Sequence, residues 1–298
     1  MKTKGKFYEK IVILGCENSH ASSFLSTIRK YEEFSDVSVI GVYSDERESC
    51  EKLKANYGVD ILDDFADAVG KVDGVVITAR NGINHAKYAA PYLDSGVPLY
   101  IDKPITNTEE DAISFIGELE KRGIRYTGGS CLRHDKLVHE IRDDRLSELD
   151  RKTLSGTVRA PLDSNSPYGG FCFYAPHLIE TVMVAFGKDI KSVCAFRNGI
   201  KTTVIFRYDD YDVTGLFVEN NYVYHITRHA EKSVRAEKIS AGPGNDWIYA
   251  EFKDYYDILC GKKSDVSPED FVRPVFVMNA IMRAIESGKE ESVNEIKF

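Results

Sequence analysis

The chain has 298 residues, of which 43% are hydrophobic and 29% are charged, and its formal net charge is −8. This acidic balance argues against nucleic acids and anionic membranes as partners, because both require a basic protein surface. The length favours about two domains of ~150 residues each, and no stretch approaches the ~18 apolar residues that a membrane span requires.

The six cysteines include no Cys-x-x-Cys pair, and the apolar run 11–14 that follows the basic residues 1–6 is too short for a signal peptide. Scattered cysteines in a chain of this size are typical of reduced thiols. We therefore expect a cytoplasmic protein.

Short apolar runs alternate with helical patterns over the first part of the chain. Strands are predicted at 11–14, 37–43, 74–78, 97–101 and 124–127, with helices at 19–30, 45–57, 84–95 and 108–122 between them. This alternation is typical of βαβ units. We expect an α/β fold with a doubly wound, parallel Rossmann sheet in a dinucleotide-binding domain, residues 1–128.

The pattern changes after the glycine pair 128–129. Short strands with turn signals are predicted at 153–160, 190–196, 202–208, 213–219, 222–227 and 233–240, and helices at 134–146, 174–186 and 268–287. This rhythm indicates an open, largely antiparallel sheet in an α+β domain, residues 129–298. Such a sheet leaves one face to cover, so we expect a homodimer or homotetramer.

Three blocks of the sequence carry a family resemblance. The first is the turn at Gly15 after the first strand, and the second is His85 followed by Gly-Val-Pro-Leu-Tyr-Ile-Asp-Lys-Pro at 96–104. The third is a Gly-Gly pair at 169–170 followed by His-Leu-Ile-Glu from His177. In this order the blocks resemble the glucose-fructose oxidoreductase, inositol dehydrogenase and MocA (Gfo/Idh/MocA) family of NAD(P)-dependent oxidoreductases.

The resemblance implies that NAD or NADP is held between the two domains, and that a sugar, cyclitol or related polyol reacts at a secondary alcohol or ketone. It implies that Lys103 lies beside the nicotinamide and the substrate, often with a cis peptide before Pro104. It also implies that His177 is the acid/base. Phe173 stands where the family usually has Asp, so Tyr174 is the candidate to supply the missing donor.

The first turn departs from the family's Gly-x-Gly-x-x-Gly, because Glu17 and His20 replace the second and third glycines. Those glycines let backbone approach the pyrophosphate and let helix and strand pack closely. We interpret Gly15, Asn18, Ser19 and His20 as cofactor-binding, since a capped helix N-terminus is an anion site. A structural helix cap in a fold that no longer binds a dinucleotide is the alternative.

Two residues at the end of the second strand bear on the choice of cofactor. Asp45 would serve the ribose of NAD, and Ser44 would accept the 2′-phosphate of NADP. A helix cap explains both equally well, so the cofactor stays undecided at this point.

Thr78 ends the third predicted strand, and Arg80 and His85 follow it, at the sheet edge where ligands of open α/β folds bind. We predict that they contact the cofactor, with a structural role for His85 and a solvated loop for Arg80 as the alternatives. Arg133 lies where the chain enters the second domain. We predict that it binds substrate together with Lys103, Tyr174 and His177.

No metal is expected. His225 and His229 are four residues apart but straddle the end of a strand-like run, and His134 and His139 are five apart, which does not align on a helix.

Two other functions stay open beside hydride transfer. One is a catalytically impaired relative that senses a small ligand or dinucleotide, favoured by the replacements at Glu17, His20 and Phe173. The other is a different reaction on the same scaffold, such as hydrolysis or isomerisation.

Overall fold

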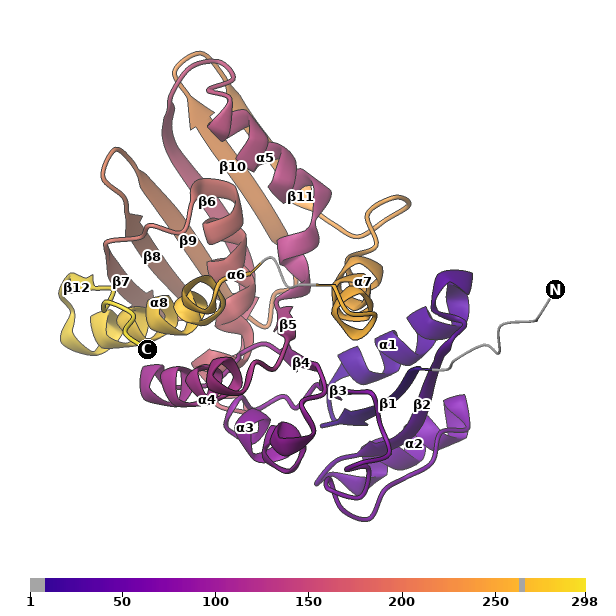
Figure 1. Cartoon of the computed structure of the whole chain (residues 1–298). Coiled ribbons are helices and arrows are strands. Elements are labelled where there is room, and N and C mark those ends of the chain that lie inside the picture. The colour runs from indigo at the N-terminus through magenta and orange to yellow at the C-terminus, as the bar shows by residue number, and fades with distance from the viewer. Residues whose placement is uncertain (1–8, 263–265) are drawn as a thin grey trace.

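The computed structural model of the chain describes residues 9–262 and 266–298, so the basic segment at the N-terminus lies outside the described residues. Five parallel strands form the first sheet in the order β2-β1-β3-β4-β5 (Figure 1). They are β1 (Glu9–Leu14), β2 (Val37–Tyr43), β3 (Gly74–Ile77), β4 (Leu99–Asp102) and β5 (Tyr126–Gly129). The predicted parallel Rossmann sheet is confirmed. The strand order reverses between β1 and β3, which places the ligand crevice of such a fold there.

Alternate residues of β1 face opposite sides of this sheet, as the period of a strand requires. Ile11 and Ile13 belong to one buried cluster, and Val12 and Leu14 to another. The first cluster includes residues of α1 (Ser19–Lys30) and α2 (Arg47–Tyr57), and the second those of α3 (Ile83–Ala89) and α4 (Glu109–Arg122). Pro91 lacks an N–H, and the helix predicted at 84–95 ends as a 3₁₀ turn over Ala90–Ser95.

One helix that the sequence analysis did not predict covers the sheet. Helix α7 (Trp247–Leu259) comes from the second half of the chain but packs against α1 and β5 (Figure 1). Its Phe252 and Tyr255 are fully buried in the same cluster as Ile11. Asp246 caps its N-terminus by accepting a hydrogen bond from Tyr249 N (3.1 Å).

The second sheet has seven strands in the order β11-β10-β6-β9-β8-β7-β12. Only the β6–β9 pair is parallel, so the expected open, largely antiparallel sheet is confirmed. The strands are β6 (Thr153–Leu162), β7 (Ser192–Asn198), β8 (Lys201–Arg207), β9 (Asp212–Glu219), β10 (Tyr224–Ala230), β11 (Val234–Ile239) and β12 (Glu291–Ser292).

Three helices accompany this sheet: α5 (Lys136–Leu146), α6 (Phe171–Phe186) and α8 (Pro268–Ser287). Asp135 caps α5 by accepting from Val138 N, so the helix begins two residues after the predicted start. Helix α6 begins three residues before the predicted start, directly after Gly170.

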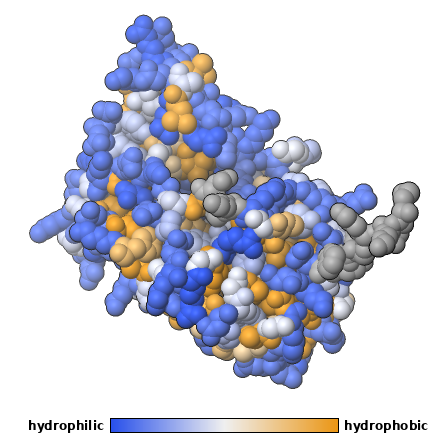
Figure 2. Space-filling view, in the orientation of Figure 1, coloured by the Kyte–Doolittle hydropathy of each residue, from blue (hydrophilic) through white to orange (hydrophobic). Residues whose placement is uncertain are grey.

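The molecular face in Figure 2 is mostly hydrophilic, with apolar residues in small groups between the polar ones. Among the described residues, no helix combines the length and the apolar character needed to cross a membrane.

Candidate active site

The turn after β1 depends on a glycine. Gly15 has φ +86°, and a Cβ there would lie 2.3 Å from the backbone nitrogen of Ala79. Thr78 is fully buried and its Oγ1 donates to the Gly15 carbonyl (2.7 Å), which ties the turn to the end of β3. The prediction that Thr78 contacts a cofactor is therefore corrected, because its hydroxyl is engaged inside the fold.

The Glu17 carboxylate bridges the ends of β2 and β3. Ser44 Oγ donates to Glu17 Oε2 (2.6 Å), and the backbone N of Arg80 donates to Oε1 (2.9 Å). The side chain is thus held along the sheet edge. Ser44 is buried, and its hydroxyl is taken up by the hydrogen bond to Glu17. The predicted contact between Ser44 and a cofactor is therefore corrected, and Glu17 is the group beside it that faces the cavity.

A cavity of about 440 Å³ opens beside this carboxylate, at the N-terminus of α1. Ser19 and Arg80, two of the predicted cofactor contacts, line it, whereas Asp45 does not. Asp45 accepts a hydrogen bond from Tyr43 (2.7 Å) and pairs with Lys87 (3.3 Å) outside it. The lining residues are Cys16, Glu17, Asn18, Ser19, Ser22, Glu46, Ser49, Lys52, Leu53, Asn56 and Arg80.

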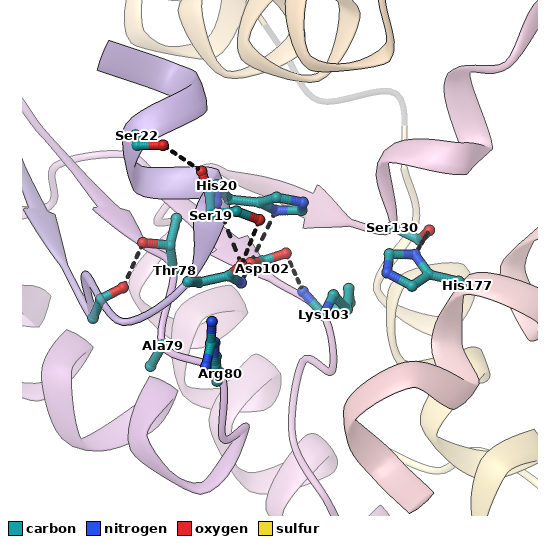
Figure 3. A network of polar contacts seen from close by, with 12 residues as sticks. Ser19, His20, Ser22, Thr78, Ala79, Arg80, Asp102, Lys103, Ser130 and His177 are labelled. Carbon is teal, nitrogen blue, oxygen red and sulfur yellow. Dashed lines mark hydrogen bonds and ion pairs between the residues drawn. The ribbon is translucent and has the colours of Figure 1, made fainter. Parts of the chain in front are cut away.

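His20 and Asn18 direct their side chains into the protein. The His20 Nδ1 lies 3.0 Å from Asp102 Oδ2, and Asn18 Nδ2 donates to the same oxygen (2.7 Å; Figure 3). Asn18 Oδ1 also caps α1 by accepting from the backbone N of His20 (3.3 Å). Both side chains therefore face Asp102 inside the fold, and the cofactor contacts of Asn18 and His20 stay predictions.

His85 is a structural residue. It is fully buried, and its two ring nitrogens lie 3.1 Å from the Ile105 carbonyl and 2.9 Å from the Ala79 carbonyl. Desolvation lowers its pKa, so the ring is neutral and donates to one of the two. The predicted cofactor contact of His85 is wrong.

Lys103 follows β4, and the bond to Pro104 is cis as the resemblance implied. Its Nζ donates to the Phe173 carbonyl (3.2 Å) and lies 4.3 Å from the centroid of the Phe173 ring. The residue is only 3% exposed, and burial lowers its pKa. Phe173 therefore covers the ammonium on which the catalytic prediction depends.

His177, on α6, faces Lys103 across Tyr174. The Tyr174 ring centroid lies 5.5 Å from Lys103 Nζ and 5.7 Å from the His177 ring centroid. Desolvation, and then the charge of Lys103, hold the pKa of His177 well below its usual range. Figure 3 shows Lys103 and His177 coming from different elements toward the same region. The structure thus brings together the three predicted catalytic residues.

Ser130 holds the His177 ring and was missed by the sequence analysis. Its Oγ lies 2.7 Å from His177 Nδ1, and its backbone N donates to both oxygens of Glu180 (3.0 Å each). No motif marks this serine. Its one sequence signal is its place directly after β5, at the carboxyl edge of the sheet.

Aromatic side chains near Lys103 pack on one another. The Arg80 guanidinium lies 4.9 Å from the Tyr168 ring centroid, and the Tyr168 and Phe173 centroids are 5.9 Å apart. These side chains therefore contact one another beside Lys103.

Arg133 lies apart from this group. It donates to the Gly128 carbonyl (2.6 Å) and lines a cavity of about 230 Å³ together with Glu180 and residues of α8. Neither Lys103 nor His177 lines that cavity. The prediction that Arg133 lies beside these two residues is therefore corrected. Burial raises the pKa of Glu180 to about 7.

Residues 10–130 match the model of the Gfo/Idh/MocA family, described as an oxidoreductase family with an NAD-binding Rossmann fold. This part of the chain is similar to the NAD-binding domain of the Gfo/Idh/MocA family. The resemblance inferred from the glycine turn and the Lys-Pro block is therefore confirmed. No curated protein matches the sequence.

Solved structures match the fold of nearly the whole chain. A putative myo-inositol dehydrogenase from Sinorhizobium meliloti has a TM-score of 0.79 at 15% identity, covering 96% of this chain and 100% of its own. A putative NADPH-dependent oxidoreductase from Desulfitobacterium hafniense has a TM-score of 0.81 at 14% identity, with coverages of 97% and 99%. GenD2 of gentamicin A biosynthesis, in complex with NAD, has a TM-score of 0.81 at 12% identity, with 97% of each chain covered. At these low sequence identities, the structural likeness shows the fold alone.

Proposed function

We propose that the chain is an NAD-dependent oxidoreductase that transfers hydride at a secondary alcohol or ketone of a polyol, cyclitol or sugar. The observation that carries this proposal is the convergence of Lys103 and His177, from different elements, on the ring of Tyr174 at the carboxyl edge of β4. A putative myo-inositol dehydrogenase among the structural neighbours supports the substrate class.

The cavity at the N-terminus of α1 suits the adenosine diphosphate half of the dinucleotide. Backbone N–H groups at a helix N-terminus and the Arg80 guanidinium favour a diphosphate. Glu17 places a carboxylate beside Ser44, at the end of β2, where an acidic group accepts the ribose hydroxyls of NAD. The same carboxylate repels a 2′-phosphate, so we propose a preference for NAD over NADP.

Access to Lys103 requires a local movement. Because Phe173 and Tyr174 lie over the ammonium, substrate reaches it only when the first turn of α6 shifts. We propose that binding is coupled to this displacement, as with other active sites that close over their reactants.

The side chains have complementary proton chemistry. Neutral His177 accepts the proton of a substrate hydroxyl, and its hydrogen bond to Ser130 fixes the ring. Burial raises the pKa of Tyr174 to about 12, so its phenol keeps its proton and donates a hydrogen bond to the substrate. Lys103 polarises the reacting oxygen. When bound, the nicotinamide supplies the hydride chemistry.

A second candidate function is a non-catalytic sensor of a dinucleotide or small ligand. The specific observation in its favour is the Phe173 carbonyl that already accepts a hydrogen bond from Lys103. In such a protein the ammonium is a structural group.

The two functions are separated by assaying NADH formation from NAD with a panel of inositols, sugars and other polyols. For an enzyme we expect turnover that Lys103→Met lowers by at least ~100-fold, while NADH affinity, followed by nicotinamide fluorescence, is retained. Lys121→Met, at an exposed position on α4, is the matched control. NADH binding without turnover on any substrate would establish the sensor, and full turnover in Lys103→Met would refute the catalytic role.

We also propose that residues 129–298, apart from α7, form the substrate and oligomerisation domain, and that the chain forms a homodimer or homotetramer. Strand β8 supports this, because half-buried Thr203 and Ile205 alternate with buried residues along it. Sedimentation velocity would test the assembly, with a monomer as the refuting result. The six free cysteines support a cytoplasmic location.

A further inference from the structure

A second cluster of chemically active side chains lies inside the Rossmann domain, where α1, β4 and α7 meet. It consists of His20, Asp102 and Glu251, which are 8%, 0% and 1% exposed. One ligand atom from each residue lies within 4.8 Å of the others, and His20 Nδ1 is 3.0 Å from Asp102 Oδ2.

Two of these side chains are held in place by the surrounding fold. Asp102 Oδ1 accepts from its neighbour's backbone, Lys103 N (2.7 Å), and Oδ2 accepts from Asn18 Nδ2 (2.7 Å). Figure 3 shows His20 and Asp102 pointing toward one another. Hydrogen bonds of this kind orient metal-binding carboxylates in other proteins.

Glu251 is the unexplained member of the cluster. No hydrogen bond of normal geometry reaches either of its carboxylate oxygens within the described part of the chain; its polar neighbour is the buried hydroxyl of Tyr100, which is also outside normal hydrogen-bond geometry. Burying a carboxylate without a partner is unfavourable by several kcal/mol, so such a group takes up a proton or binds a cation. A divalent cation that takes the place of the imidazole proton of His20 balances the negative charges of the two carboxylates.

We propose that His20, Asp102 and Glu251 bind a divalent transition-metal ion, with Zn²⁺ as the best match. One imidazole nitrogen and two carboxylate oxygens suit Zn²⁺, whereas Ca²⁺ and Mg²⁺ require larger sets of oxygen ligands. The Tyr100 hydroxyl is available to hydrogen-bond a water in the remaining coordination position. The ion pins α7, which comes from the second half of the chain, to the Rossmann sheet beside Lys103.

The direct test is metal analysis of the full chain, purified without a histidine tag or chelator. We expect about one zinc ion per chain. Glu251→Gln keeps the shape of the side chain but removes a charged ligand, and we expect it to lose bound zinc. Glu180→Gln, which changes another buried carboxyl outside the cluster, and Cys260→Ser, which removes an exposed thiol, should both keep the metal.

Cobalt substitution gives a readout that does not depend on activity or folding yield. The Co²⁺ protein should show the intense visible bands of a low-coordinate N/O site, and both these bands and a zinc-dependent rise in melting temperature should disappear in Glu251→Gln. Equal metal content in wild type and Glu251→Gln, or a Co²⁺ spectrum like that of the aqueous ion, would overturn the proposal. The cluster would then be a hydrogen-bond network in which Glu251 carries a proton, a state that agrees with burial raising its pKa to about 8.

Discussion

The two ends of the crevice along the parallel sheet differ in what fills them. At the α1 end, a cavity remains open and its wall carries Glu17, Ser19 and Arg80. At the Lys103 end, Phe173 lies over the ammonium and packs on Tyr168 and Tyr174. The open end carries the groups that we propose to recognise a nucleotide, while the closed end covers the groups that we propose to be catalytic. Cofactor recognition and access to the reacting groups are therefore separate properties of this fold.

The largest expected effect concerns the turn that shapes the open end. Gly15→Ala should lower the free energy of unfolding by more than ~3 kcal/mol, because it combines a positive φ with a Cβ too close to Ala79. Gly58 also has a positive φ, but a Cβ there would meet nothing within 4 Å. Gly58→Ala is therefore the control and should cost about 1 kcal/mol. Equal losses in urea unfolding would show that the close approach at Gly15 is unimportant.

Next in size is a pH effect behind the closed end. Burial raises the pKa of Glu180 from 4.5 to about 7, so the folded protein holds this proton more tightly than the unfolded chain. At ~1.4 kcal/mol per pKa unit, the bound proton stabilises the folded state by about 3 kcal/mol. This stabilisation is complete below about pH 4.5 and is lost as the pH rises to about 7.

Glu180→Gln lacks this titration. Relative to the variant, wild type should lose about 3 kcal/mol of stability between pH 5 and pH 8, measured by urea unfolding at each pH. A constant difference across this range would contradict the buried, protonated state of Glu180.

A smaller effect tests whether Phe173 closes the second end. Phe173→Ala should increase the rate at which an amine reagent labels Lys103 by on the order of tenfold, because local opening becomes easier. Peptide mass spectrometry measures the labelling, and the exposed Lys121 serves as an internal reference. An unchanged rate at Lys103 would mean that other residues protect it.

The smallest effect concerns the choice of cofactor at the open end. Glu17→Gln removes the carboxylate beside Ser44 and should shift the ratio of NADH to NADPH affinity toward NADPH by about fivefold, or ~1 kcal/mol. Fluorescence titration gives both affinities. Glu46→Gln changes another carboxylate on the same cavity wall and should leave the ratio unchanged; the same shift in both variants would indicate only a general loss of negative charge.

The sequence by itself determined the two sheets, their parallel and antiparallel character, and the Lys103–Pro104 block. These features depend on local periodicity, turn residues and a motif of adjacent residues, all of which are readable along the chain. Helix α7 was missed although Asp246 and the spacing of Phe252 and Tyr255 were available as signals.

Only the tertiary structure decided which polar groups remain free for a ligand. Thr78 and His85 stand at the expected edge, but the Thr78 hydroxyl donates to the Gly15 carbonyl, and the His85 ring lies between the carbonyls of Ala79 and Ile105. The separation of 82 residues between His20 and Asp102, and of 149 between Asp102 and Glu251, hides their cluster from any spacing rule. Side-chain contacts between remote segments are fixed by packing, and packing is a property of the folded chain.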